Sequence, residues 1–267
     1  MTAIALDQVT LSIGGNTILS DITLDVGEGE FVGVLGANGS GKTTLMKAIL
    51  GLLPLAGGTI RVLGRPATRG NPAIGYLPQS HAAPAGLRLS GRDFLAASIR
   101  GHRFGMPIVS AADRREIDRC LDMVGARQLA GRAFADMSGG ERQRLLIAEA
   151  LIGAPRALIL DEPLISLDPH QQRIVVDLVR KLSRELNLTV LFSAHELNQL
   201  LGAIDRVLYL GHGQAALGTV DAVINPETLS RLYGAPIEVV RAAGKIFVMS
   251  GGEVVERDQH HDHDHAH

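Results

Sequence analysis

One stretch of the chain constrains the fold more than any other, the run "EFVGVLGANGSGKTTLMKAILGLL" at residues 30–53. It starts with a short apolar segment of the kind that forms a buried strand, and from residue 42 its apolar residues recur at helical spacing until Pro54. Between these two patterns, "GANGSGKT" fits the motif G-x-x-x-x-G-K-[ST]. The sequence therefore predicts a strand, a glycine-rich loop and a helix in direct succession, which is the setting in which this motif binds phosphate.

The loop carries the groups that a nucleoside triphosphate needs. Its glycines let backbone N–H groups turn inward around a phosphate at the helix N-terminus. Lys42 can neutralise the β- and γ-phosphate oxygens, and the Thr43 hydroxyl can bind Mg²⁺. A glycine-rich turn with a purely structural role is the alternative. We expect the nucleotide site to comprise Gly36, Asn38, Gly39, Ser40, Gly41, Lys42, Thr43 and Thr44.

Two adjacent acids, Asp161 and Glu162, follow the apolar run "ALIL". Like charges side by side at the end of a buried strand repel each other and lose solvation. A Mg²⁺ ion held by Thr43 and the phosphates would resolve this, because it needs a carboxylate such as Asp161, bound directly or through water. Glu162 is then available to orient and deprotonate the water that attacks the γ-phosphate. The alternative is that Glu162 merely begins a loop.

The composition of the 267-residue chain indicates an ordinary globular protein, with 46% hydrophobic residues and a formal net charge of −2. That charge gives no general attraction to nucleic acid, which we do not expect as a partner. The single cysteine, Cys120, lies on the apolar side of a predicted helix, so we expect it to be buried and reduced. No apolar run reaches the roughly 18 residues that a membrane-spanning helix needs, and the first residues enter a strand pattern without a secretory signal.

The remaining pattern predicts the architecture around the glycine loop. Residues 1–30 alternate apolar and polar positions around a glycine turn, which indicates antiparallel strands. Residues 80–136 change character and predict a helical insert, with helices near 91–100 and 111–124. From residue 138, helices alternate with apolar strands at "ALILD", "TVLFSAH" and "RVLYLG", which predicts a parallel sheet. The segment "IEVVRAAGKIFVM" predicts a small hairpin near the C-terminus.

Further motifs stand in an order that is specific to one protein family. Gln79 lies in "GYLPQS", residues 137–144 read "MSGGERQR", residues 166–169 read "SLDP", and His195 lies in "FSAHE". Together with the glycine loop and the acid pair, they make residues 1–225 similar to the nucleotide-binding subunit of an ABC transporter. The resemblance implies an α/β fold of the P-loop NTPase type. Its RecA-like parallel sheet core would carry an N-terminal antiparallel β subdomain and a helical insert subdomain at about 80–137.

The resemblance also implies a catalytic set. His195 would contact the γ-phosphate, beside the general base Glu162. Gln79 would help to bind Mg²⁺ and would link occupancy of the γ-phosphate position to movement of the helical insert. The groove beside Gln79 would receive a short helix from a polytopic membrane permease, so that ATP binding is converted into transport.

A second subunit is implied as well. The start of the helix after residue 137 is a capping box formed by Ser138 and Glu141, but its uncovered N-terminus is also an anion site. In the family the phosphate at this site belongs to nucleotide on the opposite subunit, which implies a head-to-tail homodimer with two ATP molecules between the subunits. Asp168 would lie at that interface. The residues that would reach across to nucleotide are Ser138, Gly139 and Gly140.

Two positions depart from the family pattern. The family commonly stacks adenine on an aromatic residue near the first hairpin, whereas here no aromatic residue precedes Phe31 and Ile13 stands in its place. We therefore expect weaker base stacking, and the preference for adenine over guanine stays open. Glu141 stands where Gln is commonest, and we expect its carboxylate to turn back into the capping box.

The last ten residues form a tail at 258–267, after a small C-terminal extension at 226–257. The tail interleaves five histidines with three aspartates, a composition that favours Zn²⁺ and other borderline divalent cations. A purification tag and a solvated tail are the alternatives. The possible zinc contacts are His260, His261, His263 and His265.

These features predict the ATP-hydrolysing subunit of a metal-ion ABC importer, most consistent with zinc, at the cytoplasmic face of the membrane. Its partners would be the permease and an extracytoplasmic metal-binding protein, and its cofactors ATP and Mg²⁺. The segment after His195 and the extension are also similar to ATPase subunits of zinc and manganese importers. Manganese, siderophore or haem import is one alternative, and a non-transport ABC ATPase of translation or DNA repair is another. The transport direction and the identity of the permease stay open.

Overall fold

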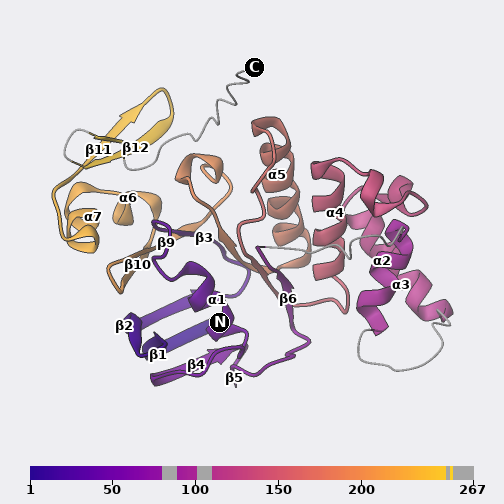
Figure 1. Ribbon diagram of the computed structural model, residues 1–267, viewed down its shortest axis with the longest axis horizontal. Coiled ribbons are helices and arrows are strands. Elements are labelled where there is room, and N and C mark those ends of the chain that lie inside the picture. Colours follow the sequence, from indigo (N-terminus) through magenta and orange to yellow (C-terminus); the bar gives the residue numbers. More distant parts are fainter. Residues whose placement is uncertain (80–88, 101–109, 251–252, 255–267) are drawn as a thin grey trace, which may run out of the picture.

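A six-stranded sheet forms the centre of the computed structural model, which describes residues 1–79, 89–100, 110–250 and 253–254 (Figure 1). The strand order is β10-β9-β3-β8-β7-β6; the strands pair in parallel except β10, which is antiparallel to β9. The strands are β3 (Phe31–Leu35), β6 (Ile74–Leu77), β7 (Ala157–Leu160), β8 (Thr189–Ser193), β9 (Arg206–Gly211) and β10 (Gln214–Gly218). The predicted parallel sheet is therefore confirmed.

The three central strands are buried at every residue, because both faces of the sheet are covered. Successive side chains of β3 alternate between two hydrophobic clusters, with Phe31 in one and Val32 in the other. The first cluster includes residues of α4 (Gly139–Ala150) and α5 (Pro169–Leu186), and the second those of α1 (Lys42–Ile49). The loops that follow β3, β6, β7 and β8 are thus anchored to a tightly packed sheet.

A second, antiparallel sheet covers the α1 face, with strand order β2-β1-β4-β5. Its hydrophobic residues join α1 and the central sheet in the second cluster. Its strands are β1 (Thr2–Ile13), β2 (Asn16–Gly27), β4 (Gly57–Val62) and β5 (Arg65–Pro66). This agrees with the alternating pattern of the first thirty residues, and the glycine turn predicted there joins β1 to β2 at Gly14 and Gly15.

Short helices follow in the next part of the chain: α2 (Gly91–Arg100), α3 (Ala111–Met123), η1 (Arg127–Leu129) and η2 (Phe134–Asp136). Both predicted helices are present. Each is preceded by a serine whose hydroxyl accepts a hydrogen bond from the backbone N–H three residues later, which is Asp93 in α2 and Asp113 in α3. α2 and α3 pack on α4 at the side of the molecule away from the C-terminal elements (Figure 1). Cys120 of α3 is buried as expected, and burial raises the pKa of its thiol to about 12.

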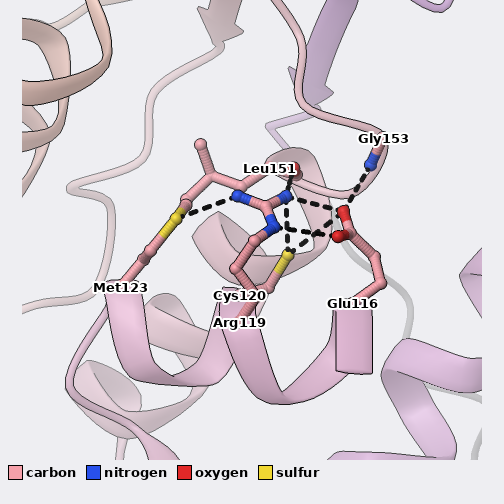
Figure 2. Close-up of polar contacts among 6 residues, drawn as sticks. All are labelled: Glu116, Arg119, Cys120, Met123, Leu151 and Gly153. Carbon is pink, nitrogen blue, oxygen red and sulfur yellow. Dashed lines mark hydrogen bonds and ion pairs between the residues drawn. The ribbon is translucent and has the colours of Figure 1, made fainter. Parts of the chain in front are cut away.

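A polar cluster joins α3 to the chain that leaves α4 (Figure 2). Glu116 accepts hydrogen bonds from the Arg119 guanidinium, at 2.6 Å and 2.8 Å, and from the Gly153 N–H at 2.9 Å. Arg119 in turn donates to the Leu151 carbonyl at 3.2 Å. These contacts satisfy backbone groups just after the C-terminus of α4, where a helix leaves carbonyls without partners. We call this the α3–α4 brace.

The C-terminal part adds α6 (Val220–Val223), α7 (Pro226–Tyr233) and a three-stranded sheet of β11 (Ile237–Ala242), β12 (Lys245–Ser250) and β13 (Glu253–Val254). The predicted hairpin is β11 and β12, whereas β10, α6 and α7 were not predicted. Asn198 attaches this sheet to the main body, since its side chain both donates to the Ile246 carbonyl and accepts the Ile246 N–H, each at 2.9 Å. Asn198 lies in η3 (Leu197–Gln199), three residues after His195. The predicted zinc contacts in the tail lie outside the described residues.

Within the described parts of the chain, no helix combines the length and the apolar character that crossing a lipid bilayer requires.

Candidate nucleotide and magnesium site

The glycine loop joins β3 directly to α1, as the sequence predicts. Gly36 has φ 142° and a Cβ atom there would lie 2.3 Å from the Leu210 carbonyl oxygen, so the position accepts no side chain. Gly41, at φ 102°, is the N-cap of α1 and offers no side chain to its N–H groups. The Ser40 hydroxyl is buried with no hydrogen-bond partner among the described residues. A helix N-terminus and an unpaired buried hydroxyl together suit a phosphate.

Lys42 points back along this loop. Its ammonium group donates to the carbonyls of Gly36 at 2.7 Å and Ala37 at 3.3 Å, and the residue is only 5% exposed. Burial lowers the pKa of Lys42, while the charges of Glu162 and Asp161 act in the opposite direction. The cation is thus held between the loop and the acid pair, where the phosphate of a nucleotide would be neutralised.

Asp161 follows β7 and is completely buried. Its Oδ1 atom accepts a hydrogen bond from the Thr43 hydroxyl at 3.2 Å, whereas its Oδ2 atom is buried and has no partner in the described chain. An unpaired buried carboxylate oxygen is costly. A Mg²⁺ ion bound to this oxygen, to Thr43 and to phosphate would remove that cost, and the oxygen donors are those that Mg²⁺ prefers. The residues therefore fit the metal that the sequence predicts.

Glu162 brings together three motifs that lie far apart in the sequence. Its Oε2 atom accepts a hydrogen bond from the Gln79 amide, and His195 Nε2 lies 3.1 Å from the same oxygen. Gln79 follows β6, Glu162 follows β7 and His195 follows β8, which are neighbouring strands of one sheet. Glu162 is 7% exposed and has φ 51°, an uncommon conformation for a residue with a side chain. The carboxylate is therefore oriented from two sides at the edge of the sheet.

Two residues at this end of the sheet were not predicted from the sequence as part of the site. The Ser193 hydroxyl, at the end of β8, lies between the two acids and contacts both. Tyr76 of β6 lies near Asp161, and burial together with that carboxylate raises the pKa of its phenol to about 12. The only sequence signal for Ser193 was a hydroxyl at the end of an apolar strand, two residues before His195.

The predicted signature segment lies at the start of α4 and forms the predicted capping box. The Ser138 N–H donates to Glu141 at 2.9 Å, and the Glu141 N–H donates to the Ser138 hydroxyl at 3.3 Å. Arg132 pairs with the same carboxylate at 2.6 Å, and Glu141 has a lowered pKa because of the Ser138 hydrogen bond. The structural role expected for Glu141 is confirmed.

The signature glycines pack beside α5 rather than beside the glycine loop. A Cβ atom at Gly139 would meet the Leu167 side chain, and one at Gly140 would meet Gln171. Asp168 is the N-cap of α5 and accepts the Gln171 N–H at 2.9 Å. Ser138, Gly139 and Asp168 are all exposed, so they are accessible to a second molecule.

Ile13 is 49% exposed at the end of β1, beside the first hairpin. Of the predicted site residues, the glycine loop, Lys42, Thr43, the acid pair, Gln79 and His195 are brought together in this chain. Ser138, Gly139 and Asp168 are exposed in a separate region at the starts of α4 and α5, where Gly140 is buried. No group of three or more His, Cys, Asp or Glu side chains in the described residues could by itself hold a metal ion.

Comparison with known proteins gives one consistent match. A family model for the ABC transporter matches residues 19–165. Similar curated proteins include the zinc import ATP-binding protein ZnuC of Cereibacter sphaeroides, 36% identical over 88% of this chain and 89% of the relative. The manganese transport system ATP-binding protein MntB of Bacillus subtilis is 32% identical over 90% of this chain and 96% of the relative.

Solved structures agree with these matches. A chain from an ABC transporter described as metal-chelate type, in an inward-facing conformation, has a TM-score of 0.78 and 26% identity, over 97% of this chain and 99% of that chain. The ADP conformation of an ATP-binding cassette of an ABC transporter has a TM-score of 0.76 at 22% identity, over 86% of this chain and 98% of that chain, and shows the fold alone.

Proposed function

This chain belongs to the ABC transporter family and is an ATPase subunit of that family, and we propose that it energises the import of zinc across a membrane. ABC ATPase subunits of importers use ATP and Mg²⁺ and work with membrane permeases. The observation that carries the substrate is that zinc import proteins of several bacteria are 32–36% identical to most of this chain. In the proposed assembly the chain lies at the cytoplasmic face, and an extracytoplasmic metal-binding protein delivers zinc.

The proposed chemistry assigns each group near the acid pair a role. Lys42 neutralises the β- and γ-phosphate oxygens, and Thr43 and Asp161 hold Mg²⁺, with Gln79 as a further ligand. Bound Mg²⁺ neutralises charge that builds on the phosphates. Glu162 takes a proton from water as the water oxygen bonds to the γ-phosphorus and the bond to the ADP oxygen breaks. His195 hydrogen-bonds the γ-phosphate, and its proximity to Glu162 supports this role.

The proposed active form is a head-to-tail homodimer. Ser138, Gly139 and Gly140 of one subunit bind the nucleotide held by Lys42 of the other, with Asp168 at the interface. The exposure of Ser138, Gly139 and Asp168 in the single chain supports this arrangement, since it leaves them accessible to a partner. Ile13 contacts the base. In the tail, His260, His261, His263 and His265 bind Zn²⁺ on the cytoplasmic side.

Manganese is the second candidate substrate, because a manganese transport protein matches 90% of this chain, within the 86–99% range of the zinc proteins. The test is the zinc, manganese, nickel and iron content of metal-limited cells that carry either the wild-type chain or Glu162→Gln in place of the native copy. We expect Glu162→Gln to lower zinc and leave manganese unchanged. A selective manganese deficit would make manganese the substrate, and unchanged levels of all four metals would contradict metal import.

A further inference from the structure

We propose that Ser193 is a positioning residue for ATP hydrolysis, and that its one hydroxyl group sets the geometry of both Asp161 and Glu162. Ser193 is the last residue of β8 and is completely buried. The proposal rests on the roles proposed above for Asp161 in binding Mg²⁺ and for Glu162 in activating water. It adds a residue that touches neither the metal nor the nucleotide.

The first contact fixes Asp161. The Ser193 hydroxyl donates to Asp161 Oδ1 at 3.0 Å, and the Thr43 hydroxyl donates to the same atom at 3.2 Å. Two donors on Oδ1 hold the carboxylate in one orientation, in which Oδ2 is the oxygen without a partner. Partners of this kind, which orient a ligand without touching the metal, strongly affect metal affinity. Ser193 therefore determines which oxygen Asp161 presents.

The second contact fixes the backbone of Glu162. The Glu162 N–H donates to the Ser193 hydroxyl oxygen at 2.7 Å, in a fully buried hydrogen bond. Glu162 has φ 51°, a left-handed conformation that is unfavourable for a residue with a side chain and persists only where its surroundings hold it. Because this N–H is buried, the loss of its acceptor would leave it unpaired. Ser193 thus stabilises the conformation that directs the Glu162 carboxylate toward Gln79 and His195.

A hydroxyl is well suited to these two contacts. It has one proton to donate and lone pairs with which to accept, so a single atom can serve a carboxylate and an adjacent N–H. The β8 strand is held on both sides, since Val34 of β3 pairs with Ser193 and Leu160 of β7 pairs with Phe192. His195 follows two residues later. The end of β8 therefore connects the histidine segment rigidly to both acids.

The experiment compares Ser193→Ala with Ser183→Ala. Ser183 is a matched control, because it is also buried and its hydroxyl also donates to the chain, at 3.0 Å from the Leu188 carbonyl, away from the acids. The purified full-length chain is titrated with a fluorescent, non-hydrolysable ATP analogue, once in Mg²⁺ and once in EDTA. The ratio of the two affinities reports the metal site without any turnover. ATPase kcat at saturating Mg²⁺ is measured in parallel.

For Ser193→Ala we expect the Mg²⁺-dependent gain in affinity to fall by about tenfold, the size typical when an outer partner of a metal ligand is removed. Affinity in EDTA should be unchanged, and kcat should fall because Glu162 loses its support. Ser183→Ala should retain the wild-type ratio and kcat. Ser193→Cys keeps a similar volume with a weaker hydrogen bond, should lie between the two, and takes the place of Ser193→Ala if that variant does not fold.

Asp161→Asn separates this inference from the roles on which it rests. If Asp161→Asn abolishes the Mg²⁺-dependent gain while Ser193→Ala keeps the wild-type ratio and kcat, the inference about Ser193 is wrong and the site assignment stands. If Asp161→Asn also keeps the gain, the role proposed for Asp161 fails, and the inference fails with it. An equal loss in Ser183→Ala would show a general effect of destabilisation and would likewise overturn the inference.

Discussion

At the scale of single residues, the site gathers charges that would be costly if any one stood alone. Lys42 is 5% exposed, Glu162 7% and Asp161 not at all. Unpaired buried charges are strongly destabilising, so each must be compensated by a partner or by a ligand. Carbonyl groups of the loop hold the ammonium, and hydroxyl and amide donors hold the carboxylates. Of the buried side-chain N and O atoms in the described site residues, only Asp161 Oδ2 and the Ser40 hydroxyl lack partners, and these are the atoms we assign to metal and phosphate.

A substitution of a single residue, Ile13, should increase the affinity for ATP. If Ile13 lies where the family stacks adenine, Ile13→Tyr should tighten ATP binding by about tenfold, because stacking of a base on an aromatic ring is worth about 1–3 kcal/mol. Equilibrium titration with a fluorescent ATP analogue measures the change. Leu186→Tyr is the control, since Leu186 is 42% exposed and lies at the end of α5. Equal effects of the two substitutions, or no effect at Ile13, would place the base elsewhere.

At the scale of elements, the α3–α4 brace holds the helical insert against the end of α4 (Figure 2). The hydrogen bond from Arg119 holds the pKa of Glu116 below its usual value. A lowered pKa in the folded state stabilises the fold above the unfolded value of about 4.5, and this contribution is lost as the pH falls through the folded value. The brace is therefore a source of acid sensitivity in the insert.

We expect Glu116→Gln to be less stable than the wild type at pH 7 and to approach it as the pH falls below about 4.5 toward the lowered pKa of folded Glu116, because protonation of the carboxylate then favours the unfolded wild-type chain. Urea unfolding at pH 7 and pH 4 measures the two free energies of unfolding. Glu185→Gln is the control. Glu185 is 58% exposed and its carboxylate lies as far as 3.9 Å from the Lys181 ammonium, and a long, exposed ion pair of this kind should contribute little to stability. A difference between Glu116→Gln and the wild type that does not change with pH would contradict an electrostatic role for the brace.

The sequence was informative wherever an element is long or carries a clear period. The central strands are fully buried apolar runs, and α5 combines a capping Asp168 with proline in its first turn, so both were predictable. α7 was missed although Asn225 caps it, Pro226 lies in its first turn and Gly234 ends it, so it was predictable; β10, by contrast, is partly buried on both faces and α6 has only four residues. At this scale local pattern is a weak guide, and tertiary contacts decide.

The same limit applies within the site. The motif residues could be named from their order, but their contacts could not, because Gln79, Glu162 and His195 meet only through the order of β6, β7 and β8 in the sheet. Ser193 could not be distinguished from a structural serine by its sequence. Ser183, equally buried, donates only to the Leu188 carbonyl, so burial in an apolar segment does not by itself mark a serine of the site.

At the scale of the whole molecule, the chain carries two separate halves of the proposed site. The glycine loop and acid pair lie at the carboxyl ends of the central strands β3 and β7. The signature segment lies at the start of α4 beside α5. A single chain could bind nucleotide at the first half, but a second chain must bring its signature segment to that nucleotide to complete the site. Substitution of the general base Glu162 should therefore change both hydrolysis, which should slow, and the ATP-bound dimer, which should persist.

The most direct test is the purified chain with Glu162→Gln. It should bind ATP within about threefold of the wild-type affinity, and turnover should fall by about 100-fold or more, because general-base catalysis contributes about 10²- to 10⁴-fold. Lys42→Ala, as a comparison, should lose ATP binding itself. With ATP and Mg²⁺, Glu162→Gln should elute as a stable dimer on size-exclusion chromatography. Wild-type turnover by Glu162→Gln, with ATP binding intact, would contradict the assignment of Glu162 as the base.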